Sequence, residues 1–207
     1  LNGGNQSVSA YNNNDSLSLT DKITIDLWIK PYATDALRVL VAKDKEGNPA
    51  LGNYVLRIAD GKLQFGYSVL VSGTDTFVDT WIGTTKQVIF PNRWYRVIAS
   101  HKFGSAIKPK IWVNNVEQTI GNWQSNGYID FAQLPYTTPD NLSIGSTTSF
   151  DSNFSGIIDE LKIYNKQYLD PDFASGLISS WSFDTNTRAK CTYEGRFDFG
   201  MQAKFLK

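Results

Sequence analysis

Apolar and polar residues alternate with a period of two along most of the 207-residue chain. In ITIDLWIK, residues 23–30, one face of a predicted strand carries the apolar side chains Ile23, Ile25, Leu27 and Ile29. No stretch keeps helical spacing over several turns; the best candidate, residues 169–177, would make only a turn or two. The pattern therefore predicts strands almost throughout.

Turn residues separate these predicted strands at short, regular intervals. Residues 54–67 predict a hairpin whose turn is Asp60-Gly61. Residues 94–103 and 108–120 predict a second pair of strands, in which Asn114-Asn115 tolerates the left-handed backbone of a tight turn. Short strands without intervening helices predict an all-β fold, a two-sheet antiparallel sandwich or jelly roll.

Composition limits the classes of partner. Hydrophobic residues make up 41% of the chain and aromatic residues 14%, enough for the core of one large domain. The 20 basic and 20 acidic residues are scattered and leave a formal net charge of +0, so we expect no nucleic-acid partner. No apolar run reaches the roughly 18 residues of a membrane span, so we expect no membrane insertion. Cys191 is the single cysteine and cannot form an internal disulfide.

Three segments carry a family resemblance. Residues 1–31 (LNGGNQSVSAYNNNDSLSLTDKITIDLWIKP) resemble the opening of laminin-G-like, concanavalin A-like domains. Residues 92–115 (NRWYRVIASHKFGSAIKPKIWVNN) resemble a tryptophan-containing strand and the hairpin that follows it, with Asn115 where the family commonly has glycine. Residues 142–169 (LSIGSTTSFDSNFSGIIDELKIYNKQYL) resemble the closing signature. The resemblance covers residues 1–170, in the family's order, and implies the same sandwich fold.

The C-terminal segment, residues 171–207, resembles the first strands of such a domain. GLISSWSFDTNTRAK (176–190) is similar to the usual beginning of the domain, and MQAKFLK (201–207) is similar to the strand that would lead into residue 1. This segment either completes the sandwich, by permutation or donor-strand pairing, or begins a second repeat. The aromatic residues that it carries favour completion, because exposing them would be costly.

The sequence predicts no catalytic residues. Asp159 and Glu160 are adjacent, so on a strand they should point to opposite sides of the sheet and cannot flank one glycosidic bond. His101, the single histidine, shares a strand face with apolar neighbours, which predicts a satisfied core or edge residue. The chain has neither G-x-S-x-G nor H-E-x-x-H.

Strand alternation places Asp159 on the side of Ile157, Leu161 and Ile163, where a carboxylate needs backbone N–H groups or a cation. The resemblance implies a structural calcium ion where the first strand meets the last. We therefore expect Asp159 to bind Ca²⁺ together with Asn14 or Asp15 and a carbonyl near Gly3. The alternative is an aspartate that is hydrogen-bonded to its own turn. Glu160 should lie in solvent beside Lys162.

The tryptophans divide into two groups. Four occupy regular strand positions, for which packing in the core is predicted: Trp28, Trp94, Trp112 and Trp181. Trp81 and Trp123 lie in the long polar stretches 72–85 and 121–140, which predict irregular loops. Together with Tyr128, they are candidates for a carbohydrate-binding surface, because sugar rings stack on exposed aromatic planes. The alternative is that both tryptophans cap the core.

These observations favour a non-catalytic binding or adhesion module, extracellular or on the cell surface. Its expected partner is a glycan, or a cell-surface or matrix protein. The alternatives are a structural repeat of a surface fibre, joined to copies of itself through terminal strands, and a polysaccharide-active enzyme. The fold does not decide among them, because one scaffold supports all three functions.

Overall fold

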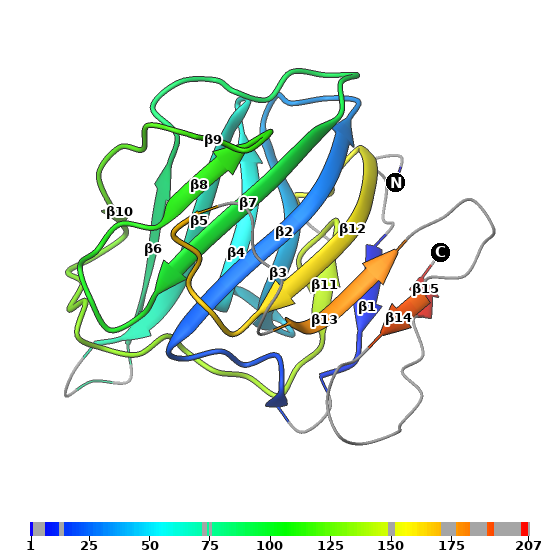
Figure 1. Ribbon diagram of the computed structural model, residues 1–207. Helices are drawn as coiled ribbons and strands as arrows, with labels where there is room; N and C mark the ends of the chain where they lie inside the picture. Colours follow the sequence, from blue (N-terminus) through cyan, green and yellow to red (C-terminus); the bar gives the residue numbers. More distant parts are fainter. Residues whose placement is uncertain are drawn as a thin grey trace.

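The computed structural model describes residues 1, 7–12, 15–71, 74, 76–148, 152–170, 177–182, 190–192 and 204–206. These residues form two antiparallel sheets that pack face to face, which confirms the predicted all-β sandwich (Figure 1). None of them belongs to a helix that is long and apolar enough to cross a membrane.

The first sheet has eight strands among the described residues, in the order β10-β6-β5-β4-β3-β11-β1-β15. The segments are β1 (Ser7–Ala10), β3 (Leu37–Lys45), β4 (Asn48–Ala59), β5 (Lys62–Leu70), β6 (Phe77–Gly83), β10 (Gln124–Ser125), β11 (Leu142–Ile144) and β15 (Lys204–Leu206). Strands β3 to β6 run as a meander, so consecutive strands are neighbours in the sheet.

The second sheet has seven strands in the described part of the chain, in the order β14-β13-β12-β2-β7-β8-β9. They are β2 (Lys22–Pro31), β7 (Tyr95–Lys102), β8 (Lys110–Val113), β9 (Val116–Glu117), β12 (Gly156–Tyr164), β13 (Leu177–Ser182) and β14 (Lys190–Thr192). In Figure 1 this sheet lies in front of the first.

Alternate residues of facing strands fill the space between the sheets. On β2 the predicted inner face is confirmed, because Ile23, Ile25, Leu27 and Ile29 are all fully buried. Opposite them, β5 contributes Leu63, Phe65, Tyr67 and Val69 to the same core cluster. The alternation also sends Gln64, Gly66 and Ser68 of β5 to the outer face of the first sheet, away from the core.

Both predicted tight turns are present. Asp60 and Gly61 have φ values of 49° and 71°, and Ala59 pairs with Lys62 across them. Asn114 and Asn115 have φ values of 50° and 65° between the paired Val113 and Val116. Two consecutive left-handed residues match the twist of the flanking strands, and asparagine, aspartate and glycine adopt this conformation at low cost.

The prediction that four tryptophans pack in the core is wrong for two of them. Trp112 and Trp181 are buried, at 2% and 1% exposure, but Trp28 and Trp94 are 41% and 44% exposed. Trp28 lies between the inward residues Leu27 and Ile29, so strand alternation turns its ring outward. The aliphatic inner face of β2 left no inward position for it.

Part of the C-terminal segment pairs with both sheets. Strand β13 lies antiparallel to β12, with Trp181 opposite Leu161, and β14 pairs with β13. Strand β15 pairs with β1 at the edge of the other sheet. Trp181 is part of the main core cluster. The division of the chain into residues 1–170 and 171–207 stays a prediction.

His101 lies inside the sandwich, surrounded by aromatic rings. Its ring is fully buried and has centroids of Phe65, Tyr67, Phe103 and Trp123 within 5.1 to 5.5 Å. Among the described residues, neither ring nitrogen has a hydrogen-bond partner, so the predicted satisfied histidine is only half correct: the residue is buried but not hydrogen-bonded. Burial lowers the pKa of His101 from 6.5 to about 4.

His101 should make the protein acid-sensitive. The unfolded chain binds the His101 proton near pH 6.5 and the native state only near pH 4, so the unfolded state holds more protons between these values. The free energy of unfolding should therefore fall by about 3 kcal/mol as the pH falls from 6.5 to 4. In urea titrations, His101→Phe should remove this part of the pH dependence. Parallel curves for the two proteins would contradict the prediction.

Trp181 should contribute strongly to the stability of the sandwich. Trp181→Ala should lower the free energy of unfolding by about 3–5 kcal/mol, because it leaves a large cavity in the core. The control is Trp94→Ala, which removes an exposed indole. Urea unfolding measures both losses. Equal, small losses would mean that β13 is not packed on the sandwich in solution.

Candidate functional site

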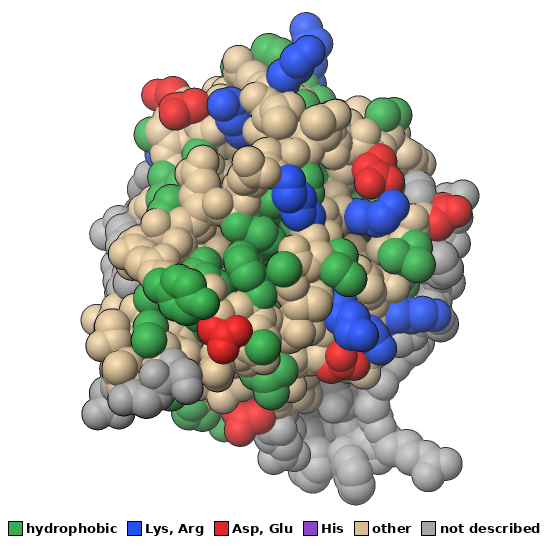
Figure 2. All heavy atoms as spheres, turned by 90° about the vertical axis from the view of Figure 1, so that its left-hand side faces the viewer, with side chains coloured by type: hydrophobic (Ala, Val, Ile, Leu, Met, Phe, Trp, Pro, Cys, Tyr) green, Lys and Arg blue, Asp and Glu red, His purple; other side chains and the backbone are tan. Residues whose placement is uncertain are grey.

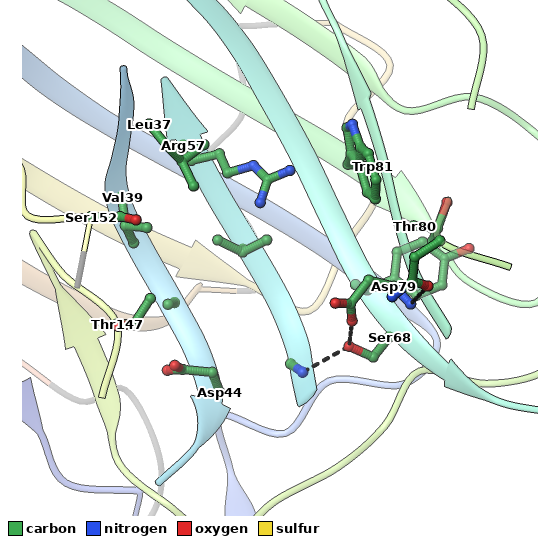
Figure 3. Close-up of a pocket in the computed structure, with 15 residues that line it drawn as sticks. Leu37, Val39, Asp44, Arg57, Ser68, Asp79, Thr80, Trp81, Thr147 and Ser152 are labelled. Carbon is green, nitrogen blue, oxygen red and sulfur yellow. Dashed lines mark hydrogen bonds between the residues drawn. The ribbon is translucent and has the colours of Figure 1, made fainter. Parts of the chain in front are cut away.

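A cavity of about 410 Å³ lies on the outer face of the eight-stranded sheet (Figure 3). Strands β3 to β6 supply most of its wall. Apolar and small residues line it at Leu37, Val39, Ala42, Gly52 and Val55. Polar and aromatic residues line it at Asp44, Arg57, Tyr67, Ser68, Asp79, Thr80, Trp81, Asn126, Thr147 and Ser152.

Arg57 projects from β4 toward Trp81 on β6, across the intervening β5 (Figure 3). Its Nε donates to Oε1 of Gln64, at 2.9 Å, and the guanidinium carbon lies 5.5 Å from the centre of the Trp81 ring. Burial lowers the pKa of Arg57, and the charge of Asp79 opposes that shift. Within the described part of the chain, Nη1 and Nη2 have no hydrogen-bond partner.

Trp81 is held in place from two sides. Its Nε1 donates to Oε1 of Gln124 on the edge strand β10, at 3.0 Å. Its cross-strand partner is Gly66, where an added Cβ would lie 2.6 Å from the backbone oxygen of Thr80. The absence of a side chain at Gly66 therefore lets β6 and the Trp81 ring lie close to β5. Trp81 in turn fixes Arg57 by a cation–π contact.

Asp79 lies on β6, the strand that also carries Trp81, and presents its carboxylate to the pocket (Figure 3). Its Oδ1 accepts a 2.6 Å hydrogen bond from the Ser68 hydroxyl, and its N–H donates to Oδ1 of Asn126. Ser68 Oγ also accepts from the N–H of Gly52. Burial raises the pKa of Asp79, and the Ser68 hydrogen bond and Arg57 oppose that rise. Oδ2 has no hydrogen-bond partner among the described residues.

A second carboxylate, Asp44 of β3, lies across the floor of the pocket from Asp79 (Figure 3). Its oxygens accept from the N–H and the hydroxyl of Thr148. The pocket thus combines a positioned guanidinium, two carboxylates, an indole and a small apolar floor. Such a site can hold a polar ring through directional hydrogen bonds.

The side of the molecule on which β6 and the edge strand β10 lie carries no strong bias of charge sign. Figure 2 shows basic and acidic side chains interspersed with hydrophobic ones over this face. Interspersed charges do not create the extended potential of one sign that steers polyanions.

The three residues predicted to bind carbohydrate lie in different environments. Trp81 lines the pocket, and it belongs to a regular strand where the sequence predicted an irregular loop. Trp123 is half-buried against the core and in ring contact with Tyr67 and His101. Tyr128 is 83% exposed and outside the pocket lining.

A bulge in β12 changes the expected geometry at Asp159. The pairing with β2 shifts register between Asp159 and Lys162, and Glu160 has a φ of 49°. Ile158 and Leu161 therefore both face the core, with two residues between them. The expectation that Asp159 shares the core side with Leu161 is wrong, because the bulge breaks the alternation. Its Oδ1 instead accepts from the N–H of Glu160, at 2.8 Å.

The neighbour of Asp159 behaves as predicted. Oε2 of Glu160 lies 3.2 Å from Nζ of Lys162 in an exposed ion pair. The carboxylates of Asp159 and Glu160 thus have separate partners and do not form an acid pair.

The other predicted calcium ligands are partly outside the described residues, which include neither Asn14 nor Gly3. Oδ1 of Asp15 accepts from Nδ2 of Asn12, at 3.1 Å. Its charge also acts on the buried Lys43, whose Nζ donates to the carbonyl oxygens of Thr138 and Asp140. Among the described residues, no three His, Cys, Asp or Glu side chains form a group that could hold a metal ion. The calcium site stays a prediction.

Sequence reasoning missed Arg57, Asp79 and Asp44. Arg57 and Asp79 occupy outward positions of strands, where a charged residue is the ordinary expectation. One signal was available: Arg57 sits at an alternate position from Val55 and across the hairpin from Gln64, so two polar side chains face one side of that hairpin. The partner strand β6 was not predicted, so Asp79 had no assigned face.

The model of a laminin G-like family, described as the concanavalin A-like lectin/glucanases superfamily, matches residues 2–172. The chain belongs to this superfamily. No curated protein matches it.

Solved structures of the same fold include carbohydrate-binding proteins. A Bacteroides ovatus ATCC 8483 protein, described as a candidate carbohydrate-binding protein, matches with a TM-score of 0.60 and 16% identity over 98% of this chain. The chain spans 58% of that structure.

The CBM40 module of the Ruminococcus gnavus IT-sialidase, bound to alpha2,3 sialyllactose, matches with a TM-score of 0.50 and 16% identity. This match covers 75% of the present chain and 82% of the module. The same module bound to alpha2,6 sialyllactose matches with a TM-score of 0.50 and 13% identity. That match covers 80% of the present chain and 89% of the module. At these identities the similarities establish the fold.

The calcium prediction can be tested by thermal unfolding. Added Ca²⁺ should stabilise the protein relative to EDTA, by about 2.7 kcal/mol when its concentration is 100 times Kd. Asp159→Ala should abolish that difference, whereas the control Glu160→Gln should retain it. Equal melting temperatures in Ca²⁺ and EDTA would contradict the prediction.

Proposed function

We propose that this domain is a non-catalytic glycan-binding module that works outside the cell or on its surface, with the pocket around Arg57, Asp79 and Trp81 as its binding site. The observation that carries the proposal is the convergence of a fixed guanidinium and a fixed carboxylate on one 410 Å³ pocket. Carbohydrate hydroxyls both donate and accept hydrogen bonds, so they fit such a mixed set.

Preorganisation supports the proposal. Gln64 and Trp81 orient Arg57 before any ligand arrives, and Ser68 orients Asp79. A ligand that meets fixed groups loses less free energy to the ordering of side chains. The fold family and its carbohydrate-binding neighbours agree with this function.

One alternative draws on the same pocket. Asp44 and Asp79 line it from opposite sides, and paired carboxylates are the machinery of glycoside hydrolysis. A screen for reducing ends released from polysaccharides addresses this function. Turnover that Asp79→Asn abolishes would replace the binding proposal with an enzymatic one.

The proposal predicts that filling the pocket abolishes binding. A Cβ added at Gly52, on the pocket floor, meets only ordinary contacts at 3.8 and 3.9 Å, so Gly52→Val should fold. Valine also suits a strand. On a glycan array the wild-type chain should bind a defined set of glycans, and Gly52→Val should lose at least about tenfold in affinity.

A second variant guards against an unfolded product. Arg57→Gln keeps a shorter, polar side chain but removes the positive charge and the fork of donors. Circular dichroism and melting temperature establish that each variant folds. Wild-type binding retained by both folded variants would locate the glycan site elsewhere, and absence of binding by the wild type would contradict the proposal.

A further inference from the structure

The charges that line the pocket do not favour an anion. Asp44, Asp79 and Arg57 are the charged residues of its lining, which gives two acidic groups against one basic group. The formal charge of the lining is therefore −1. A carboxylate-bearing sugar bound at Arg57 would lie in the field of both aspartates, and like charges in a partly buried site repel each other.

The free hydrogen-bonding atoms of Arg57 and Asp79 also favour a neutral ligand over an anion. Nη1 and Nη2 of Arg57 are donors, and Oδ2 of Asp79 is an acceptor; among the described residues none of these three atoms has a partner. The Ser68 hydroxyl donates to Asp79, as it would to an ionised carboxylate. A ligand carboxylate can only accept, so it cannot supply a donor to Oδ2 of Asp79. A hydroxyl can donate to Asp79 while it or its neighbour accepts from Arg57.

We infer that the pocket selects neutral sugars over acidic ones, and holds them by hydroxyl groups that bridge Arg57 and Asp79. This inference rests on the proposed function and names the ligand class of the same site. Asp79 is then a specificity-determining residue: it accepts from a ligand hydroxyl and repels a ligand carboxylate. The half-buried indole of Trp81 offers an apolar edge beside these groups.

Asp79→Asn separates the two ligand classes by the sign of its effect. For a neutral glycan the change weakens a charge-assisted hydrogen bond, so affinity should fall by about tenfold. For an acidic glycan the change removes a repulsion, so affinity should rise. Isothermal titration with the strongest neutral array hit, and with 3′-sialyllactose as the acidic probe, measures both effects.

Glu117→Gln is the matched control. It removes one negative charge from an exposed position on β9, in the other sheet, and should leave both affinities unchanged. Preference for neutral glycans, with the predicted loss in Asp79→Asn, supports the inference.

Two other results would overturn it in distinguishable ways. Stronger binding of sialyllactose than of every neutral glycan, enhanced in Asp79→Asn and lost in Gly52→Val, would reject neutral selectivity while the glycan-binding function stands. No binding of any glycan by the wild-type chain would reject both.

Discussion

The tight packing of aliphatic and aromatic side chains between the two sheets is the constraint on which the candidate site depends. Tyr54, Leu56 and Ile58 of β4 are fully buried, so the residues between them must face outward. Arg57 lies on the outer face for this reason. Shifting the register of β4 by one residue would bury its charge, which makes the outward position of Arg57 as secure as the core itself.

Contacts with neighbouring residues then orient the outward-facing side chains of the pocket. Gly66 allows a close approach of β6, Trp81 lies over Arg57, and Gln64 holds its Nε. Ser68 similarly directs Asp79. Each group in the pocket is therefore positioned by a neighbour that is itself part of the sheet. Sites built on strands hold their geometry better than sites on loops.

The same architecture explains why fold similarity does not determine the ligand. Solved structures of the same fold match this chain at only 13–16% identity, so the layers of the sandwich persist although most of the sequence differs. Outward residues are constrained little by packing, so they can change without loss of the fold. The charges of Asp44, Asp79 and Arg57 therefore have to be read from this chain itself.

The period-two pattern alone was sufficient for the fold class, for the inward face of β2 and for the two asparagine- or glycine-containing turns, because these depend on local alternation and backbone preference. Three features required the tertiary structure. The bulge at Glu160 reverses the faces that simple alternation assigns to Asp159. Trp28 and Trp94 are exposed although large aromatic residues usually pack inside. Arg57, Asp79 and Asp44 come from three strands, and only the pairing of β3 to β6 brings them to one pocket. Sequence patterns report on which face a side chain lies, but the groups that meet across strands depend on register and bulges, which arise from pairing between distant segments.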